Sequence, residues 1–246
     1  MNIKCNRSIF SFADDTSIII DDINKNHIHS KSSQVLSIIK IWFDNNLLEL
    51  NLTKTCFMNF SINIMSTTGK NYIKAHHINC IEFNINTGSA ISNDNKCNCT
   101  SISSVQKVKY LGITIDENLK WQNHIINTTT KIRLLFYKFK TLSNILLPTT
   151  MRMVFIVMAQ SIYSYGIGSW GGAYNKHLNS LETTINSLIK ISFKKPFRMS
   201  TVLLYKECNL LNLTQLYARH ILTNMFFLDV QKFKFKHNHC TRVKQT

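Results

Sequence analysis

Hydrophobic and polar residues follow two different patterns along the chain, and the change lies near Trp121. Before it, short apolar runs with the composition of β-strands occupy residues 7–12, 16–20, 54–64, 78–85 and 105–115. One segment among them, residues 30–46, has the spacing of an amphipathic helix. Beyond Trp121, helical spacing recurs over residues 121–142, 149–165, 176–193 and 213–234. The pattern therefore predicts an α+β part followed by an all-α part, with a boundary at 116–121.

The first two apolar runs flank Ala13, Asp14 and Asp15, which predicts a β-hairpin with carboxylates at its tip. Adjacent carboxylates repel each other and cost stability unless a cation binds them. Mg²⁺ prefers such oxygen ligands, and two-metal phosphoryl transfer uses carboxylates to hold its ions. On these residues alone, an ordinary Asp-Asp turn between strands remains the alternative.

The formal net charge of +16 is unevenly distributed. Residues 1–130 hold 12 Lys and Arg against 10 Asp and Glu, whereas residues 131–246 hold 17 against 3. A basic second half indicates a polyanionic partner, with nucleic acid ahead of a membrane surface. No apolar stretch approaches the roughly 18 residues of a spanning helix. The best one, residues 153–163, is short and contains Gln160 and Ser161.

The N-terminal residues and the cysteines indicate an intracellular protein. The first residues, Met-Asn-Ile-Lys-Cys-Asn-Arg, run into polar residues and the acidic Asp14 and Asp15, so they do not form a secretory signal. The 7 cysteines are odd in number and lack the spacing of a disulfide framework, so reduced thiols are expected. We therefore expect a protein that is not secreted and lies in the cytoplasm or the nucleus.

Four motifs follow one another along the chain. They are Phe-Ala-Asp-Asp at 12–15, Asn-Leu-Leu-Glu-Leu-Asn-Leu-Thr-Lys-Thr at 46–55, Lys-Tyr-Leu-Gly-Ile at 109–113 with Leu-Lys-Trp-Gln-Asn-His-Ile at 119–125, and Tyr-Gly-Ile-Gly-Ser-Trp-Gly at 165–171. In this order they resemble the reverse transcriptases of non-LTR retrotransposons, the jockey-like group in particular. The resemblance extends over most of the chain.

The resemblance implies that residues 1–116 form an incomplete polymerase palm and residues 117–246 a helical thumb and post-thumb region. It implies an RNA-directed DNA polymerase that works on an RNA template and a DNA primer. Its cofactor in the complete enzyme would be Mg²⁺, without a small-molecule cofactor and without a membrane partner.

The resemblance also implies a role for individual residues. Asp14 and Asp15 match the catalytic pair that binds the metal ions. Lys54 matches a lysine near the phosphates of the incoming nucleotide, a candidate proton donor to pyrophosphate; a solvated strand lysine is the alternative. Phe12 would support the turn near the primer end. The hairpin that grips the primer backbone is matched by Lys109, Tyr110, Leu111 and Gly112.

Two basic clusters in the second half are expected to contact the phosphates of a template–primer duplex. They are Lys131, Arg133, Lys138 and Lys140, and then Lys190, Lys194, Lys195 and Arg198. The alternative is that these charges only keep a helical surface soluble. Four large aromatic residues are expected in the core, namely Trp42, Phe43, Trp121 and Tyr165. His124 is expected to pack between helices and not to bind a metal.

In the family that the chain resembles, a third palm carboxylate and the fingers precede the Asp-Asp hairpin. Here 13 residues precede Asp14. Two adjacent carboxylates cannot by themselves hold two ions in the bridging geometry. We therefore expect a C-terminal fragment that is inactive alone. The alternatives are a non-catalytic nucleic-acid-binding helical module and a decayed remnant without a selected role.

Overall fold

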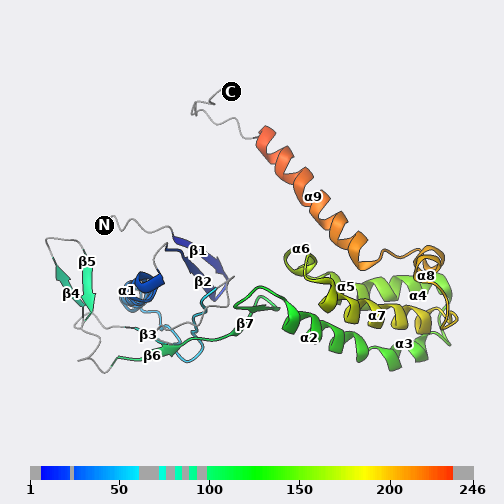
Figure 1. Ribbon diagram of the computed structural model, residues 1–246, viewed down its shortest axis with the longest axis horizontal. Helices are drawn as coiled ribbons and strands as arrows, with labels where there is room; N and C mark the ends of the chain where they lie inside the picture. Colours follow the sequence, from blue (N-terminus) through cyan, green and yellow to red (C-terminus); the bar gives the residue numbers. More distant parts are fainter. Residues whose placement is uncertain are drawn as a thin grey trace. The chain divides into compact units, whose positions relative to one another are not determined.

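The computed structural model describes residues 7–22, 25–60, 72–75, 81–84, 89–92 and 99–234. Its contacts divide the chain into two compact units, Met1–Val108 and Lys109–Thr246 (Figure 1). The fold is α+β, as the hydrophobic pattern predicts. The division lies several residues before the expected boundary, because the second strand of the hairpin at 107–116 packs with the helices. The assignment of the two parts to palm and thumb stays a prediction.

The strands of the described residues form antiparallel pairs. The first pair is β1 (Arg7–Phe12) with β2 (Asp15–Ile20), at the positions predicted for a hairpin. Three further pairs are β3 (Tyr72–Lys74) with β6 (Ser101–Ser103), β4 (Ile81–Asn84) with β5 (Ser89–Ser92), and β7 (Lys107–Tyr110) with β8 (Ile113–Asp116). The predicted strand pair that breaks at Gly112 is therefore confirmed.

The first unit has a small core beneath α1 (Lys25–Asn45), the helix predicted at 30–46. Leu36 of α1 packs with residues of β3 and β6. The buried residues of this core are Leu36, Ile73, Ala75 and Ile102, and the partly buried residues packed against it are Leu50, Leu52 and Phe57. The predicted core position of Trp42 is wrong, since the indole is 56% exposed near the end of α1. The strand predicted at 54–64 is also wrong over its described part, 54–60, where Phe57 makes only an isolated bridge to Ser104.

The second unit is helical beyond β8. Its helices are α2 (Gln122–Arg133), α3 (Phe136–Leu142), α4 (Pro148–Phe155), the π-helical segment η2 (Ile156–Gln160), α5 (Ser161–Ser164), α6 (Ile167–Trp170), α7 (Asn175–Ser192), α8 (Thr201–Cys208) and α9 (Leu213–Lys234). The predicted helix at 121–142 is interrupted between α2 and α3, and α6 and α8 were not predicted. Pro148 begins α4 at the position where proline costs no hydrogen bond.

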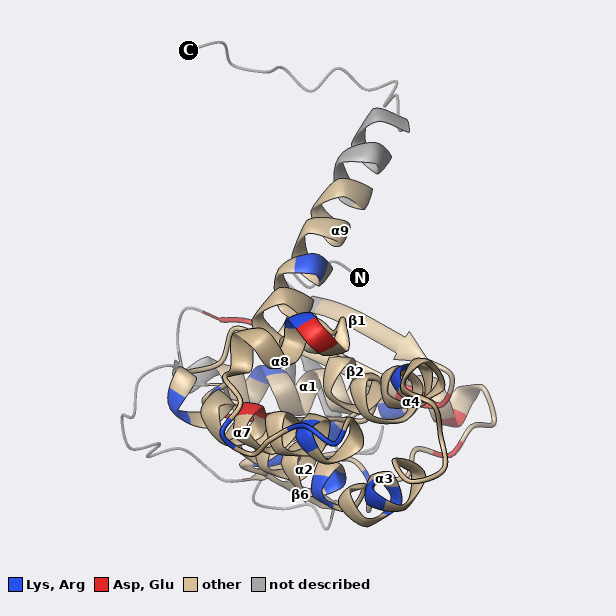
Figure 2. Ribbon diagram, turned by 90° about the vertical axis from the view of Figure 1, so that its right-hand side faces the viewer, with Lys and Arg blue, Asp and Glu red and all other residues tan. Residues whose placement is uncertain are grey.

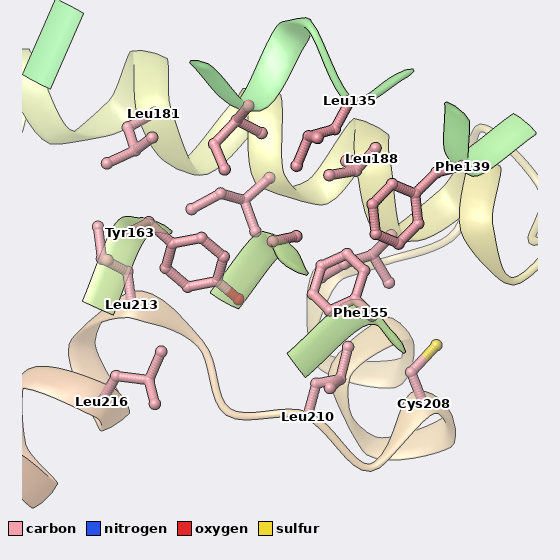
Figure 3. Packing of buried hydrophobic residues seen from close by; sticks show 14 of the residues in the cluster. Leu135, Phe139, Phe155, Tyr163, Leu181, Leu188, Cys208, Leu210, Leu213 and Leu216 are labelled. Atoms are coloured by element: carbon pink, nitrogen blue, oxygen red, sulfur yellow. The ribbon is translucent and has the colours of Figure 1, made fainter. Parts of the chain in front are cut away.

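The helical unit holds the larger core. The apolar stripe of α7, which includes Leu181, Ile185 and Leu188, packs against α2 and α3. Figure 3 shows Phe139 of α3 beside Phe155 of α4, and their ring centroids lie 5.7 Å apart. Trp170 of α6 is the largest fully buried side chain. Within the described residues, no helix is long and apolar enough to cross a membrane.

Candidate functional site

The tip of the first hairpin carries the two predicted metal ligands. Asp14 lies in the two-residue turn with Ala13, and Asp15 begins β2 opposite Phe12. Both carboxylates are exposed. Ala13 has a φ of 51°, a left-handed conformation that costs a residue with a Cβ about 1–2 kcal/mol. The structure therefore places the acidic pair on a strained, solvent-facing turn.

The side chains of the β1–β2 hairpin are unusually apolar for their exposure. Phe12 is 65% exposed, and Phe10 and Ile19 on the same face of the pair are also largely exposed. Among the described residues, β1 and β2 pair only with each other. A face of this kind is usually buried by further strands or helices.

Lys54 lies on a turn that is ordered by Asn51. The Asn51 Oδ1 atom accepts hydrogen bonds from the backbone amides of Thr53 and Lys54, both at 3.2 Å, and its carbonyl accepts one from the Thr55 hydroxyl at 2.8 Å. This asparagine turn replaces the strand predicted here, because a side-chain acceptor competes with ladder hydrogen bonds. Lys54 is exposed, and its place near the phosphates of an incoming nucleotide stays a prediction.

The described residues contain no group of three or more His, Cys, Asp or Glu side chains that could hold a metal ion. Within that part of the chain, Asp14 and Asp15 therefore have no third His, Cys, Asp or Glu beside them. Their two exposed carboxylates have the oxygen donors that Mg²⁺ prefers, and they would supply part of a coordination shell.

The hairpin predicted to grip a primer has a tip formed by Leu111 and Gly112. Their φ values of 45° and 82° are those of a type I′ turn, whose twist matches paired strands. Lys109 is exposed on β7, with Tyr110 beside it and partly buried. The hydroxyl of Tyr165 donates a hydrogen bond of 2.7 Å to the Leu111 carbonyl. Tyr165 was predicted in the core, but it is 54% exposed and reaches the hairpin from the end of α5.

Asp116 connects this hairpin to α2, and sequence reasoning missed it. Its carboxylate is buried and accepts hydrogen bonds from the backbone amides of Lys120, at 2.8 Å, and Trp121, at 2.7 Å. Trp121 has a left-handed conformation at the start of α2 and is partly buried against the core. An aspartate six residues before the first residue of α2 was the available signal, and it is a common one.

His124 is a packing residue, as predicted. Its ring is buried against Trp170, with centroids 5.4 Å apart, and its Nδ1 atom accepts a hydrogen bond of 3.3 Å from the Thr114 amide. Burial lowers the pKa of His124 below its ordinary value of 6.5, and the nearby charge of Lys131 lowers it further. The imidazole is therefore held neutral in the folded protein.

The neutral imidazole predicts an acid-sensitive helical unit. Because the pKa of His124 is depressed by folding, only the unfolded chain gains a proton as the pH falls below about 6.5. The contribution of neutral His124 to the free energy of unfolding is therefore fully present above pH 6.5, and it decreases as the pH falls below that value. Thermal unfolding followed by circular dichroism from pH 7.5 to 5.5 should show a smaller decrease in His124→Asn than in the natural chain. His177→Asn, on the less buried start of α7, is the control and should keep the full decrease.

The first basic cluster lies on the outer side of α2 and α3. The inner side is buried through Ile125, Ile132 and Phe139. Lys131 and Arg133 come from the end of α2, and Lys138 and Lys140 come from α3. We call these four residues the α2–α3 basic face. Figure 2 shows the basic segments of α2 and α3 in blue.

The α2–α3 basic face is available to a ligand. All four side chains are exposed, and none has a hydrogen bond or an ion pair with another described residue. Leu134 and Tyr137, which lie between these cations in the sequence, are 71% and 81% exposed. Cations beside an exposed aromatic ring are typical of nucleic-acid-binding surfaces.

The second basic cluster, which we call the α7–α8 cluster, is partly occupied by contacts within the protein. The Lys190 ammonium donates to the Phe197 carbonyl at 2.7 Å and lies 5.5 Å from the centre of that ring. Lys195 forms an ion pair with Glu207 at 2.6 Å, and this hydrogen bond raises the pKa of Lys195. Lys194 and Arg198 are exposed. Two of the four cations therefore stabilise the connection between α7 and α8.

Comparison with known proteins gives one informative match. A segment of this chain is 26% identical over 117 residues to a Drosophila melanogaster protein named "Probable RNA-directed DNA polymerase from transposon BS". The match covers 46% of this chain and 13% of that protein, so the chain spans a small part of its relative. No family model matches the chain. No solved structure matches it either. The match supports a reverse-transcriptase-like origin, in agreement with the four motifs.

Proposed function

We propose that this chain is part of the reverse transcriptase of a jockey-like non-LTR retrotransposon and that it binds a template–primer duplex. In this proposal the first unit is the palm remainder that carries Asp14 and Asp15, and the second is the thumb with the following helices. The relative's name and the order of the four motifs support the class of enzyme.

The observation that carries the binding proposal is the α2–α3 basic face. Four exposed cations on two consecutive helices can contact several phosphates of one duplex. Phosphate contacts release counterions and provide sequence-independent affinity. The exposed Tyr137 ring on α3 adds a surface for sugar or base contacts. An RNA–DNA duplex recognised by its backbone requires no base-specific side chains.

In the complete enzyme, Mg²⁺ held by Asp14 and Asp15 would activate the primer hydroxyl and stabilise the departing pyrophosphate. Lys54 would donate a proton to that leaving group, and Lys109 and Tyr110 would contact the primer backbone. The strain at Ala13 supports a functional turn, because backbone strain is concentrated at functional sites. With two adjacent carboxylates as the recognised ligands, the 246-residue chain alone should not catalyse nucleotide addition.

The test uses one fluorescent RNA–DNA template–primer in two assays. Fluorescence anisotropy gives the association constant at each salt concentration. Its logarithm should decrease linearly with the logarithm of the salt concentration, with a slope of about −0.9 per phosphate contacted, a value calibrated on B-form duplex. Primer extension with the same duplex, Mg²⁺ or Mn²⁺ and all four nucleotides should give no product above background. Weak binding independent of salt would contradict the binding proposal. Extension that Asp14→Asn abolishes would contradict the proposed inactivity.

A further inference from the structure

We infer that Tyr165 is a positioning residue for the β7–β8 turn, which it holds to the helical unit so that the turn is ordered before a primer binds. The role of the turn in primer binding rests on the proposed function. The attachment of the turn by Tyr165 rests on contacts between residues that lie 54 positions apart in the sequence.

The β7–β8 turn needs such an attachment because its backbone is strained. Leu111 has a φ of 45°, a conformation that costs a residue with a side chain about 1–2 kcal/mol. Type I′ turns favour Asn or Gly at this first position, and leucine offers neither a local hydrogen bond nor freedom from steric conflict. A contact from outside the hairpin must therefore help to maintain the turn.

Tyr165 provides that contact in two ways. Its hydroxyl donates to the Leu111 carbonyl at 2.7 Å, which fixes the peptide orientation in the turn. Its ring lies against Gly112, where an added Cβ atom would be 3.2 Å from the Tyr165 Cε1 atom. A larger residue at position 112 would displace the ring and would also be strained at a φ of 82°.

Tyr165 is itself held firmly by the helical core. The indole Nε1 atom of buried Trp170 donates a hydrogen bond of 2.9 Å to the Tyr165 carbonyl. The next residue, Gly166, has a φ of 61°, and any side chain there would collide with Ile113 of β8. The corner between α5 and α6 thus fits against the tip of the hairpin and the start of β8.

These contacts join the tip of the hairpin to the helical core, in addition to the contacts that β8 makes with α2. Lys109 and Tyr110 immediately precede the turn, so their positions depend on its geometry. When the turn is already ordered in the free protein, binding does not cost the entropy of ordering it. The affinity for the ligand is therefore higher. Loss of the Tyr165 hydroxyl should therefore weaken template–primer binding without unfolding the helices.

The experiment compares Tyr165→Phe with Tyr174→Phe in the full 246-residue chain. Tyr165→Phe removes one hydroxyl and keeps the ring against Gly112. The control removes an exposed hydroxyl from Tyr174, just before α7 and outside the proposed binding surface. Amide hydrogen exchange over residues 109–114 should accelerate about 3- to 10-fold in Tyr165→Phe, the range expected for one lost hydrogen bond. Template–primer affinity measured by anisotropy should decrease within the same range.

The two readouts separate the possible outcomes. Unchanged exchange in Tyr165→Phe would overturn the attachment of the turn. Faster exchange with unchanged affinity in a chain that binds duplex would overturn the positioning role and leave the proposed function intact. If the natural chain does not bind the duplex, the proposed function fails together with this role, whereas the exchange result still reports on the attachment. A fall in melting temperature similar to that of a core mutant would show a general structural role instead.

Discussion

Replacement of Trp170 by alanine is expected to lower the free energy of unfolding of the helical unit by about 3–5 kcal/mol. Trp170 is fully buried, and its removal leaves a large cavity between α6 and the adjoining helices. The substitution also removes the ring that packs on His124 and the donor to the Tyr165 carbonyl. Urea unfolding followed by far-ultraviolet circular dichroism measures the effect, because most of the helical signal comes from this unit.

The matched control for Trp170→Ala is Tyr137→Ala, which also truncates a large aromatic residue. Tyr137 is 81% exposed, so its removal should change the unfolding free energy by less than about 0.5 kcal/mol. Similar small effects for both variants would mean that the helical unit does not enclose Trp170 as described. Partial unfolding of Trp170→Ala without urea would agree with the prediction, since a loss of this size approaches the whole stability of many domains.

The second large effect is expected from neutralising the α2–α3 basic face. The triple variant Lys131→Gln, Arg133→Gln, Lys138→Gln should bind a template–primer duplex about 10²- to 10³-fold more weakly near 0.1 M salt. Its log–log salt slope should be smaller by about 2.7, since each lost phosphate contact changes the slope by about 0.9. These three side chains are exposed and have no competing partner among the described residues, so their replacement should leave the fold intact.

The comparison is a second triple variant of equal charge, Lys190→Gln, Lys194→Gln, Lys195→Gln. Lys190 is held by the Phe197 carbonyl and Lys195 by Glu207. Of the three substituted lysines, Lys194 alone is therefore free to contact a phosphate. The slope should therefore change by no more than about 0.9. Equal losses in the two variants would show that net charge, and not the α2–α3 face, governs binding. From the sequence alone the two basic clusters are equivalent. In the structure they differ, because Lys190 and Lys195 have partners within the protein.

Several elements could be predicted because their signal is local. The apolar stripe of α7 repeats at helical spacing, and the predicted 176–193 differs by one residue at each end from Asn175–Ser192. The last helix was predicted at the bounds that the structure has, Leu213–Lys234. Both hairpins were predicted because short β-rich runs flank a turn. Periodicity depends on residues a few positions apart, which a single sequence displays directly.

Other features could not be predicted because they depend on contacts between distant residues. The helix at 121–142 is interrupted after Arg133, although its apolar spacing continues, and Trp42 and Tyr165 are exposed although large aromatic residues are usually buried. The turn formed around Asn51 outweighed the strand propensity of the residues that follow. In each case the packing of neighbouring segments or a local side-chain hydrogen bond overrides average preferences.

The sequence by itself determined the order of an α+β part and a helical part, the acidic pair at the tip of the first hairpin, and the concentration of positive charge in the second half. Only the tertiary structure decided which cations are free, because Glu207 and the Phe197 carbonyl are brought to Lys195 and Lys190 by the packing of α8 and the turn after α7. It alone placed Tyr165 on the Leu111 carbonyl and buried Asp116 under backbone amides. Charge and periodicity are properties of neighbouring residues, whereas the availability of a side chain depends on whichever distant groups the fold places beside it.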